Sequence, residues 1–119
     1  MAAKLDSFSA HQQALELFDL VVADLRALSH HPALSRLIAQ HIARADSIAA
    51  RIAEGYGRGS AKDSSHFLVI ARGAAHETGG RYQRLKHWLA PEVIAARVAL
   101  CGDIIAILTA SLNTLRRPQ

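Results

Sequence analysis

The sequence predicts an all-α fold, an antiparallel up-and-down four-helix bundle, and three observations support this prediction. Alanine, which has the highest helix propensity, supplies 23 of the 119 residues. The aromatic residues, which favour strands, are only three Phe, two Tyr and one Trp. Short breaks at residues 29–32, 55–60 and 89–91 separate four segments with helical spacing of apolar residues. Breaks this short join antiparallel neighbours, so we expect one domain over residues 1–119, with loose ends at about 1–8 and 116–119.

The segment before the first break carries one apolar stripe. Ser9 and Gln12 have the three-residue spacing of a capping box, which predicts the start of a helix. The expected core residues recur at intervals of three and four: Leu15, Phe18, Val22 and Leu25. This spacing predicts a helix with one buried face.

The second segment opens with Pro32, a residue suited to the first turn of a helix. Its apolar stripe is Leu34, Ile38, Ile42, Ala45, Ala49 and Ile52. Gly55 is predicted to cap the end of this helix, because glycine adopts the left-handed conformation without steric cost.

The third segment begins at Ser60, with Asp63 three residues later in a second capping-box spacing. Its expected buried face is Phe67, Ala71, Ala74, Thr78, Tyr82 and Leu85. The pair Gly79-Gly80 falls within the helix, where it indicates either a kink or a close approach of another helix.

The fourth segment is the most apolar and carries two stripes. One is a heptad seam of Ile94, Val98, Cys101, Ile105, Leu108, Leu112 and Leu115. The other, beside it, is Val93, Leu100, Ile104 and Ile107. A helix that buries one face in a single-chain bundle does not need both stripes. We therefore predict that the second stripe is an oligomer interface with another subunit.

Composition also bounds the location of the protein. Residues 1–10 lack the apolar centre of a signal peptide. The stretch 98–112 is expected to be too short, and with Asp103 and the flanking Arg97 too polar, to span a membrane. The single cysteine, Cys101, excludes a disulfide framework within the chain. The expectation is a cytoplasmic protein without membrane contact.

The titratable residues do not have the spacing of a catalytic or metal site. None of the seven histidines has a second histidine four residues away, and no Glu-x-x-His motif occurs. Cys101 lies in the apolar seam, where a thiol behaves as a small apolar side chain. The carboxylates are scattered singly. We expect no metal, no cofactor and no enzymatic activity.

Two groups of basic residues are the candidate binding residues in a chain of net charge +4. Arg44, Arg51 and Arg58 are seven residues apart, which places them on one helix face. Arg81, Arg84 and Lys86 follow the double glycine, close to Trp88. If the groups align across the bundle, they form a basic band for the phosphates of RNA or DNA. The alternative is a solvated polar face in which Arg81 pairs with Glu77.

The string Glu54-Gly55-Tyr56-Gly57 combines a helix end with a tight glycine-rich turn. It has neither the Gly-Lys-Ser/Thr ending nor the preceding strand of a phosphate-binding loop. One interpretation is a plain connection with Tyr56 packed over it. The other is a docking point that presents Tyr56 and Arg58 to a partner.

The same region resembles a known family. Residues 47–48, 52–58, 67–68, 70–73 and Glu77 are similar to the motif block of four-helix-bundle proteins encoded in intervening sequences of bacterial 23S ribosomal RNA genes. That family is related to the accessory variability determinant proteins of diversity-generating retroelements. The chain departs from the family pattern at residues 49–51 and 78–79. The resemblance implies an up-and-down four-helix bundle that assembles as a homopentamer. Its retroelement relatives contact nucleic acid and a reverse transcriptase.

The expected function is therefore a non-catalytic, oligomeric accessory protein with a basic surface that binds RNA or DNA. The alternative is a protein–protein interaction scaffold without nucleic-acid binding. The two differ in whether the arginines share one exposed face or are taken up in ion pairs.

Overall fold

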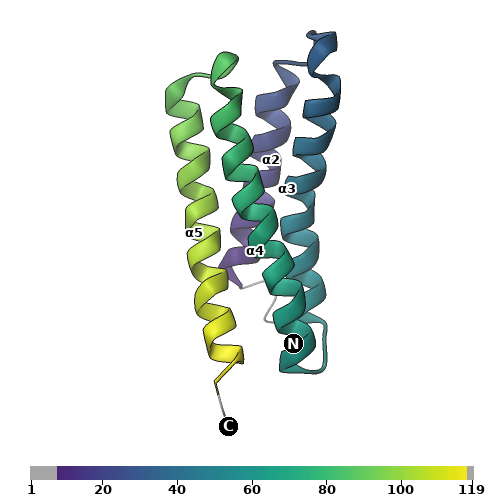
Figure 1. Ribbon diagram of the computed structural model, residues 1–119, viewed down its shortest axis with the longest axis vertical. Helices are drawn as coiled ribbons and strands as arrows, with labels where there is room; N and C mark the ends of the chain where they lie inside the picture. Colours follow the sequence, from purple (N-terminus) through teal and green to yellow (C-terminus); the bar gives the residue numbers. More distant parts are fainter. Residues whose placement is uncertain (1–7, 118–119) are drawn as a thin grey trace.

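The computed structural model describes residues 8–117, and in this range the chain forms four long α-helices (Figure 1). They are α2 (Ser9–Arg26), α3 (Ser35–Tyr56), α4 (Ala61–Arg84) and α5 (Pro91–Leu115), with short 3-10 turns at Pro32–Leu34 and Leu85–His87. Successive helices run in opposite directions and build a rod of 52 × 21 × 20 Å. The predicted all-α four-helix bundle is confirmed.

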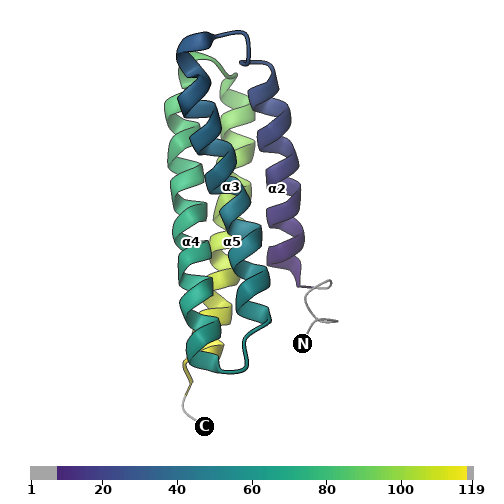
Figure 2. The same cartoon turned by 90° about the vertical axis from the view of Figure 1, so that its right-hand side faces the viewer.

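The four helices form a closed ring, because each packs against two others. α3 lies between α2 and α4, and α5 packs against both α4 and α2 (Figure 2). The end at the top of Figure 1, called the upper end below, holds the α2–α3 and α4–α5 connections. The lower end holds the α3–α4 connection. Residues far apart in the sequence therefore meet at the upper end.

The buried face of α2 differs from the predicted stripe. Leu15 is 48% exposed, and of the predicted residues only Leu25 is fully buried. The core residues of α2 are instead Ala10, Ala14, Leu17, Val21 and Leu25. Adjacent residues on a helix diverge by about 100°. The buried face is thus turned by one residue from the predicted stripe and includes two alanines.

The predicted faces of α3 and α4 agree better with the core. In α3 the stripe residues Ala45, Ala49 and Ile52 are buried, whereas Ile38 and Ile42 are half-buried. The α4 core includes the predicted Ala71, Ala74, Thr78 and Tyr82, together with Ser64, Leu68, Ala75 and Gly79. The buried core consists mainly of alanine, leucine and isoleucine, and it also contains the side chains of Tyr82, Thr78 and His41.

The helix starts agree with two of the three sequence signals. The Ser60 hydroxyl accepts a hydrogen bond from the Asp63 backbone N–H at 3.2 Å, so the predicted cap of α4 is confirmed. Pro32, predicted in the first turn of a helix, begins the 3-10 turn Pro32–Leu34 that leads directly into α3. The cap predicted at Ser9 is wrong. Phe8 takes the N-cap position, without a side-chain hydrogen bond, and Ser9 is the first helical residue.

The glycines act through their small size. α3 continues to Tyr56, so the cap predicted at Gly55 is wrong, and no described glycine has a positive φ. A Cβ atom at Gly55 would lie 3.1 Å from Leu68 Cδ2 and 3.3 Å from the Ser64 carbonyl oxygen. A Cβ atom at Gly79 would lie 3.5 Å from Cys101 Cβ of α5. α4 continues through Gly79 as one helix. The close approach predicted for the double glycine is therefore confirmed.

α5 is apolar over most of its surface. Ile104, assigned from the sequence to an oligomer interface, is fully buried in the core of this chain, so that assignment is wrong. Val93, Leu100 and Ile107 are half-buried and stay candidates for the interface. Within the described range, α5 is the one helix long and apolar enough to cross a membrane. The stretch 98–112, which the sequence suggested to be too short and too polar for a span, is part of this longer helix.

The predicted loose ends fall mostly outside the described residues, which exclude 1–7 and 118–119. Phe8 was included in the N-terminal loose end. Its ring packs against Tyr56, with 4.5 Å between the ring centroids. At the other end, the Arg116 N–H donates to the Leu112 carbonyl and closes the last turn of α5. The described parts of both ends are thus held by the bundle.

Candidate nucleic-acid interface

Two of the candidate arginines share one carboxylate near the lower end. Glu54 Oε1 accepts a hydrogen bond from Arg51 Nη1, and Glu54 Oε2 lies 3.8 Å from Arg58 Nη2. The Arg58 guanidinium also lies 4.5 Å from the centroid of the Phe67 ring. All three charged side chains are partly exposed. The family-motif residue Glu54 therefore balances part of the positive charge that the sequence assigns to phosphate binding.

Arg44, the third member of the first group, is paired across the α3–α4 interface. Its Nε lies 3.1 Å from Glu77 Oε2, and both side chains are about half-exposed. The alternative pairing of Glu77 with Arg81 is therefore wrong. Arg81 instead donates from Nη1 to Gln40 Oε1 at 3.3 Å. The Arg44–Glu77 ion pair and the Arg81–Gln40 hydrogen bond lie about one helical turn apart along α3 and α4.

The second group lies at the upper end, where α4 terminates. Arg84 and Lys86 are exposed, and in the part of the chain that is described no carboxylate pairs with either. Trp88, beside them, is 40% exposed. The six predicted residues thus divide into three arginines held by carboxylates and three basic residues that are not.

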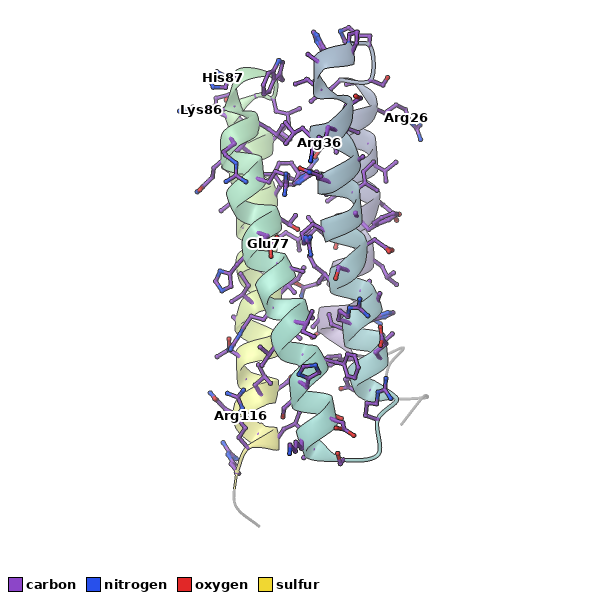
Figure 3. The ribbon with its side chains drawn as sticks, turned by 45° about the vertical axis from the view of Figure 1, so that its right-hand side comes forward. Arg26, Arg36, Glu77, Lys86, His87 and Arg116 are labelled. Atoms are coloured by element: carbon purple, nitrogen blue, oxygen red, sulfur yellow. The ribbon has the colours of Figure 1, made fainter. Side chains whose placement is uncertain are left out.

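The upper end gathers further basic residues beside Arg84 and Lys86. Figure 3 places Arg26 and Arg36 at the ends of α2 and α3, and Lys86 and His87 at the neighbouring end of α4. Arg36 lies outside the seven-residue spacing of Arg44, Arg51 and Arg58. The antiparallel packing of α3 on α4 brings it to the same end as the C-terminus of α4.

Beneath this end lies a polar cluster with one residue from each helix. Asp24 of α2 accepts hydrogen bonds from the Tyr82 hydroxyl of α4 at 2.6 Å and from Arg97 Nε of α5 at 2.8 Å. Arg97 Nη2 also donates to Asp24 Oδ1 at 3.1 Å. Burial, and then the hydrogen bond to Asp24, raise the pKa of Tyr82. The pKa of Arg97 is also raised, chiefly by its hydrogen bond to Asp24.

His41 of α3 completes the cluster. It is fully buried, and its ring meets the Tyr82 ring edge-on at 4.6 Å. Neither ring nitrogen has a hydrogen-bond partner among the described residues. Burial, followed by the positive charge of Arg81, lowers the pKa of His41 from 6.5 to about 4. His41 is therefore neutral at pH 7, and it lies beneath the arginines of α4.

The glycine turn at the lower end borders a cavity of about 300 Å³. Gly55, Tyr56 and Leu68 line it, with the hydroxyl-bearing Ser64, Ser111 and Thr114 and the side chain of Leu115. The Ser64 hydroxyl donates to the Gly55 carbonyl at 2.7 Å, and Tyr56 packs on Phe8. These contacts favour the interpretation of the string 54–57 as a packed connection.

The reactive groups sought in the sequence lie apart in the structure. Within residues 8–117, no three His, Cys, Asp or Glu side chains are grouped so that they could hold a metal ion. Cys101 is buried, and burial raises the pKa of its thiol to about 11. The thiol is therefore protonated at neutral pH and packed against Gly79.

Comparison with known proteins gives two findings. A family model described as 23S rRNA-intervening sequence protein matches residues 6–89. The crystal structure of a protein of unknown function from the S23 ribosomal protein family of Bacteroides thetaiotaomicron superposes with a TM-score of 0.81. The two chains are 21% identical, and the superposition covers 87% of this chain and 97% of that chain. At this identity the likeness shows the fold. No curated protein matches the sequence.

Proposed function

Because the chain belongs to the family of 23S rRNA-intervening sequence proteins, we propose that it is a non-catalytic, self-associating accessory protein that binds RNA or DNA. The binding surface is the upper end of the bundle rather than the whole α3–α4 face. This proposal keeps Arg81, Arg84 and Lys86 from the sequence analysis. It gives Arg44, Arg51 and Arg58 a smaller role, because carboxylates already balance them.

One observation carries the proposal: basic side chains without carboxylate partners gather at the upper end. Figure 3 shows Arg26, Arg36 and Lys86 there, and Arg84 is the last residue of α4 at the same end. No ion pair joins any of the four to a described carboxylate. Of the acidic residues at this end, Asp24 is held by Arg97 and Tyr82. Glu92 begins α5. Unpaired cations concentrate phosphates without first breaking an internal ion pair.

A salt titration tests the proposal. We expect the protein to bind labelled structured RNA, duplex DNA or single strands with a log affinity that falls linearly with log salt. Neutralising the upper end with Arg84→Gln and Lys86→Gln is expected to weaken binding about tenfold and to reduce the salt slope by about 2.

The matched control removes two charges from the lower end, with Arg51→Gln and Arg58→Gln. It should change affinity less than about threefold, since Glu54 already balances these arginines. Absence of binding at low salt by the folded protein would contradict the proposed function. The scaffold function would then lead, favoured by the arginines that are held in ion pairs. An equal loss in both double variants would contradict the choice of the upper end.

Self-association is the second part of the proposal, with α5 as the contact. Val93, Leu100 and Ile107 are seven residues apart and half-buried, so they share one side of the helix. Only 17% of the most apolar 18-residue segment of α5 is buried against the rest of the chain. Apolar surface that the bundle leaves exposed favours a partner, and a second copy of α5 would cover it. Five subunits, as the family resemblance implies, is the expected number.

We expect light scattering to give a mass several times the 12.9 kDa of one chain. Leu100→Glu should shift this mass toward the single chain, because the interface would bury an unpaired charge. Leu15→Glu, at an exposed position of α2, should leave the mass unchanged. A wild-type mass of one chain at all concentrations would contradict self-association.

A further inference from the structure

The packing of α3 on α4 sets an antiparallel register that continues to the upper end. Arg44 lies opposite Glu77, and Gln40 lies opposite Arg81. Each step of four residues is about one helical turn, or 6 Å of rise. One more turn toward the upper end reaches Arg36 on α3 and residues 84–85 on α4. Arg36, Arg81 and Arg84 therefore lie at the same end of the α3–α4 interface, and Figure 3 shows Arg36 at that end of α3.

These three guanidinium groups lack negative partners. Arg81 Nη1 donates to the neutral amide oxygen of Gln40, and its Nε is buried without a hydrogen-bond partner in the described range. No described carboxylate pairs with Arg36 or Arg84. The neighbouring carboxylates are taken, Glu77 by Arg44 and Asp24 by Arg97. The upper end of the α3–α4 interface thus holds three guanidinium groups whose charge no described carboxylate balances, and an anion bound there would accept hydrogen bonds from their exposed N–H groups.

We propose that Arg36, Arg81 and Arg84 form a phosphate-binding site at the upper end of the α3–α4 interface, with Gln40 orienting Arg81. The planar guanidinium group offers paired N–H donors that match two oxygens of a phosphate. α3 supplies one such group and α4 supplies two, all at the same end of the interface. The phosphate is either part of a nucleic acid, in which case the assignment rests on the proposed function, or free inorganic phosphate.

His41 supplies an internal reporter of this site. Arg81 and Arg84 both lower its pKa, in addition to burial, whereas Asp24 raises it. A dianion bound between the arginines would offset their effect on the imidazole. Occupation of the site should therefore raise the pKa of His41, while binding elsewhere on the surface should not.

The test follows the Arg81 Nε–H resonance and the His41 ring by NMR in the full chain, at constant ionic strength set with chloride. Inorganic phosphate is titrated first, followed by single-stranded oligonucleotides with and without a 5′-phosphate. We expect a saturable shift of Arg81 Nε–H and a rise in the His41 pKa. Arg36→Gln and Arg84→Gln should each weaken binding about fivefold or more. Arg44→Gln, which removes a neighbouring but paired guanidinium, should leave binding nearly unchanged.

The outcomes separate this site from the wider proposed function. Phosphate binding at Arg81 without nucleic-acid binding would support the site, with free phosphate as its ligand, and overturn the nucleic-acid function. Nucleic-acid binding that leaves Arg81 and His41 unperturbed would overturn the site and leave the nucleic-acid function intact. An equal loss of phosphate affinity in Arg36→Gln and Arg44→Gln would also overturn the site, because the overall positive charge of the protein would then explain the binding.

Discussion

Asp24→Asn is expected to lower the free energy of unfolding by about 3 kcal/mol. Asp24 receives three hydrogen bonds, from Tyr82 and twice from Arg97, and its side chain is only 10% exposed. The amide of asparagine cannot neutralise Arg97, whose side chain is 18% exposed. Removing one partner of a largely buried pair leaves an uncompensated charge inside the bundle, which costs more than the pair contributes. Chemical denaturation at pH 7 measures the change.

Two comparisons isolate this effect. Glu77→Gln breaks the exposed pair with Arg44 and should cost less than about 1 kcal/mol, since solvent screens that pair. In a chain that already carries Arg97→Met, Asp24→Asn should cost clearly less than in the wild type, because the stranded cation is gone. If Asp24→Asn costs no more than Glu77→Gln, the cluster at the upper end does not couple the four helices.

His41 is expected to make the bundle sensitive to acid. The pKa of its imidazole is 6.5 in the unfolded chain and about 4 in the folded one. Between these values the unfolded chain binds a proton that folded His41 does not, so stability falls as the pH decreases from about 6.5 to about 4. The loss is complete below the folded pKa and amounts to about 3 kcal/mol, at 1.36 kcal/mol for each pH unit.

The variant His41→Leu should remove the part of the stability loss that comes from protonation of this imidazole. Leucine has a similar volume and no ring nitrogens to leave without partners, so stability at pH 7 should stay the same or rise. Denaturation curves at several pH values between 7 and 4 should then show a shallower loss for His41→Leu than for the wild type. His76→Gln, which changes an exposed histidine, should keep the wild-type slope. Parallel slopes for wild type and His41→Leu would contradict the assignment.

Local sequence signals identified most of the fold. The Ser60–Asp63 pair marked a helix start that the structure confirms. The double glycine indicated either a kink or a close approach of another helix, and Gly79 faces Cys101 of α5. Two local signals failed, since Ser9 and Gly55 do not cap their helices. Other errors fall where the neighbouring helices decide which face is buried. The core face of α2 includes Ala10 and Ala14, which a stripe of larger apolar residues does not reveal.

The candidate interface could be predicted only in part. Arg81, Arg84 and Lys86 were found because they cluster within one segment. The regular spacing of Arg44, Arg51 and Arg58 also suggested a shared face, but spacing contains no information about their partners. Glu77 comes from the next helix to pair with Arg44, and Glu54 lies between Arg51 and Arg58. Arg36 lies outside the regular spacing, and its position at the same end as the C-terminus of α4 exists only in the packed bundle.

By itself, the sequence determined the helices, their order and their antiparallel connections, because propensity, capping and apolar spacing act within a few residues of the chain. Only the tertiary structure decided that Ile104 is core, that His41 is buried, and that Asp24 joins Tyr82 and Arg97. Such contacts connect residues on different helices. Their register depends on how side chains of all four helices interdigitate, so each charge acquires its partner, or is left without one, when the helices pack.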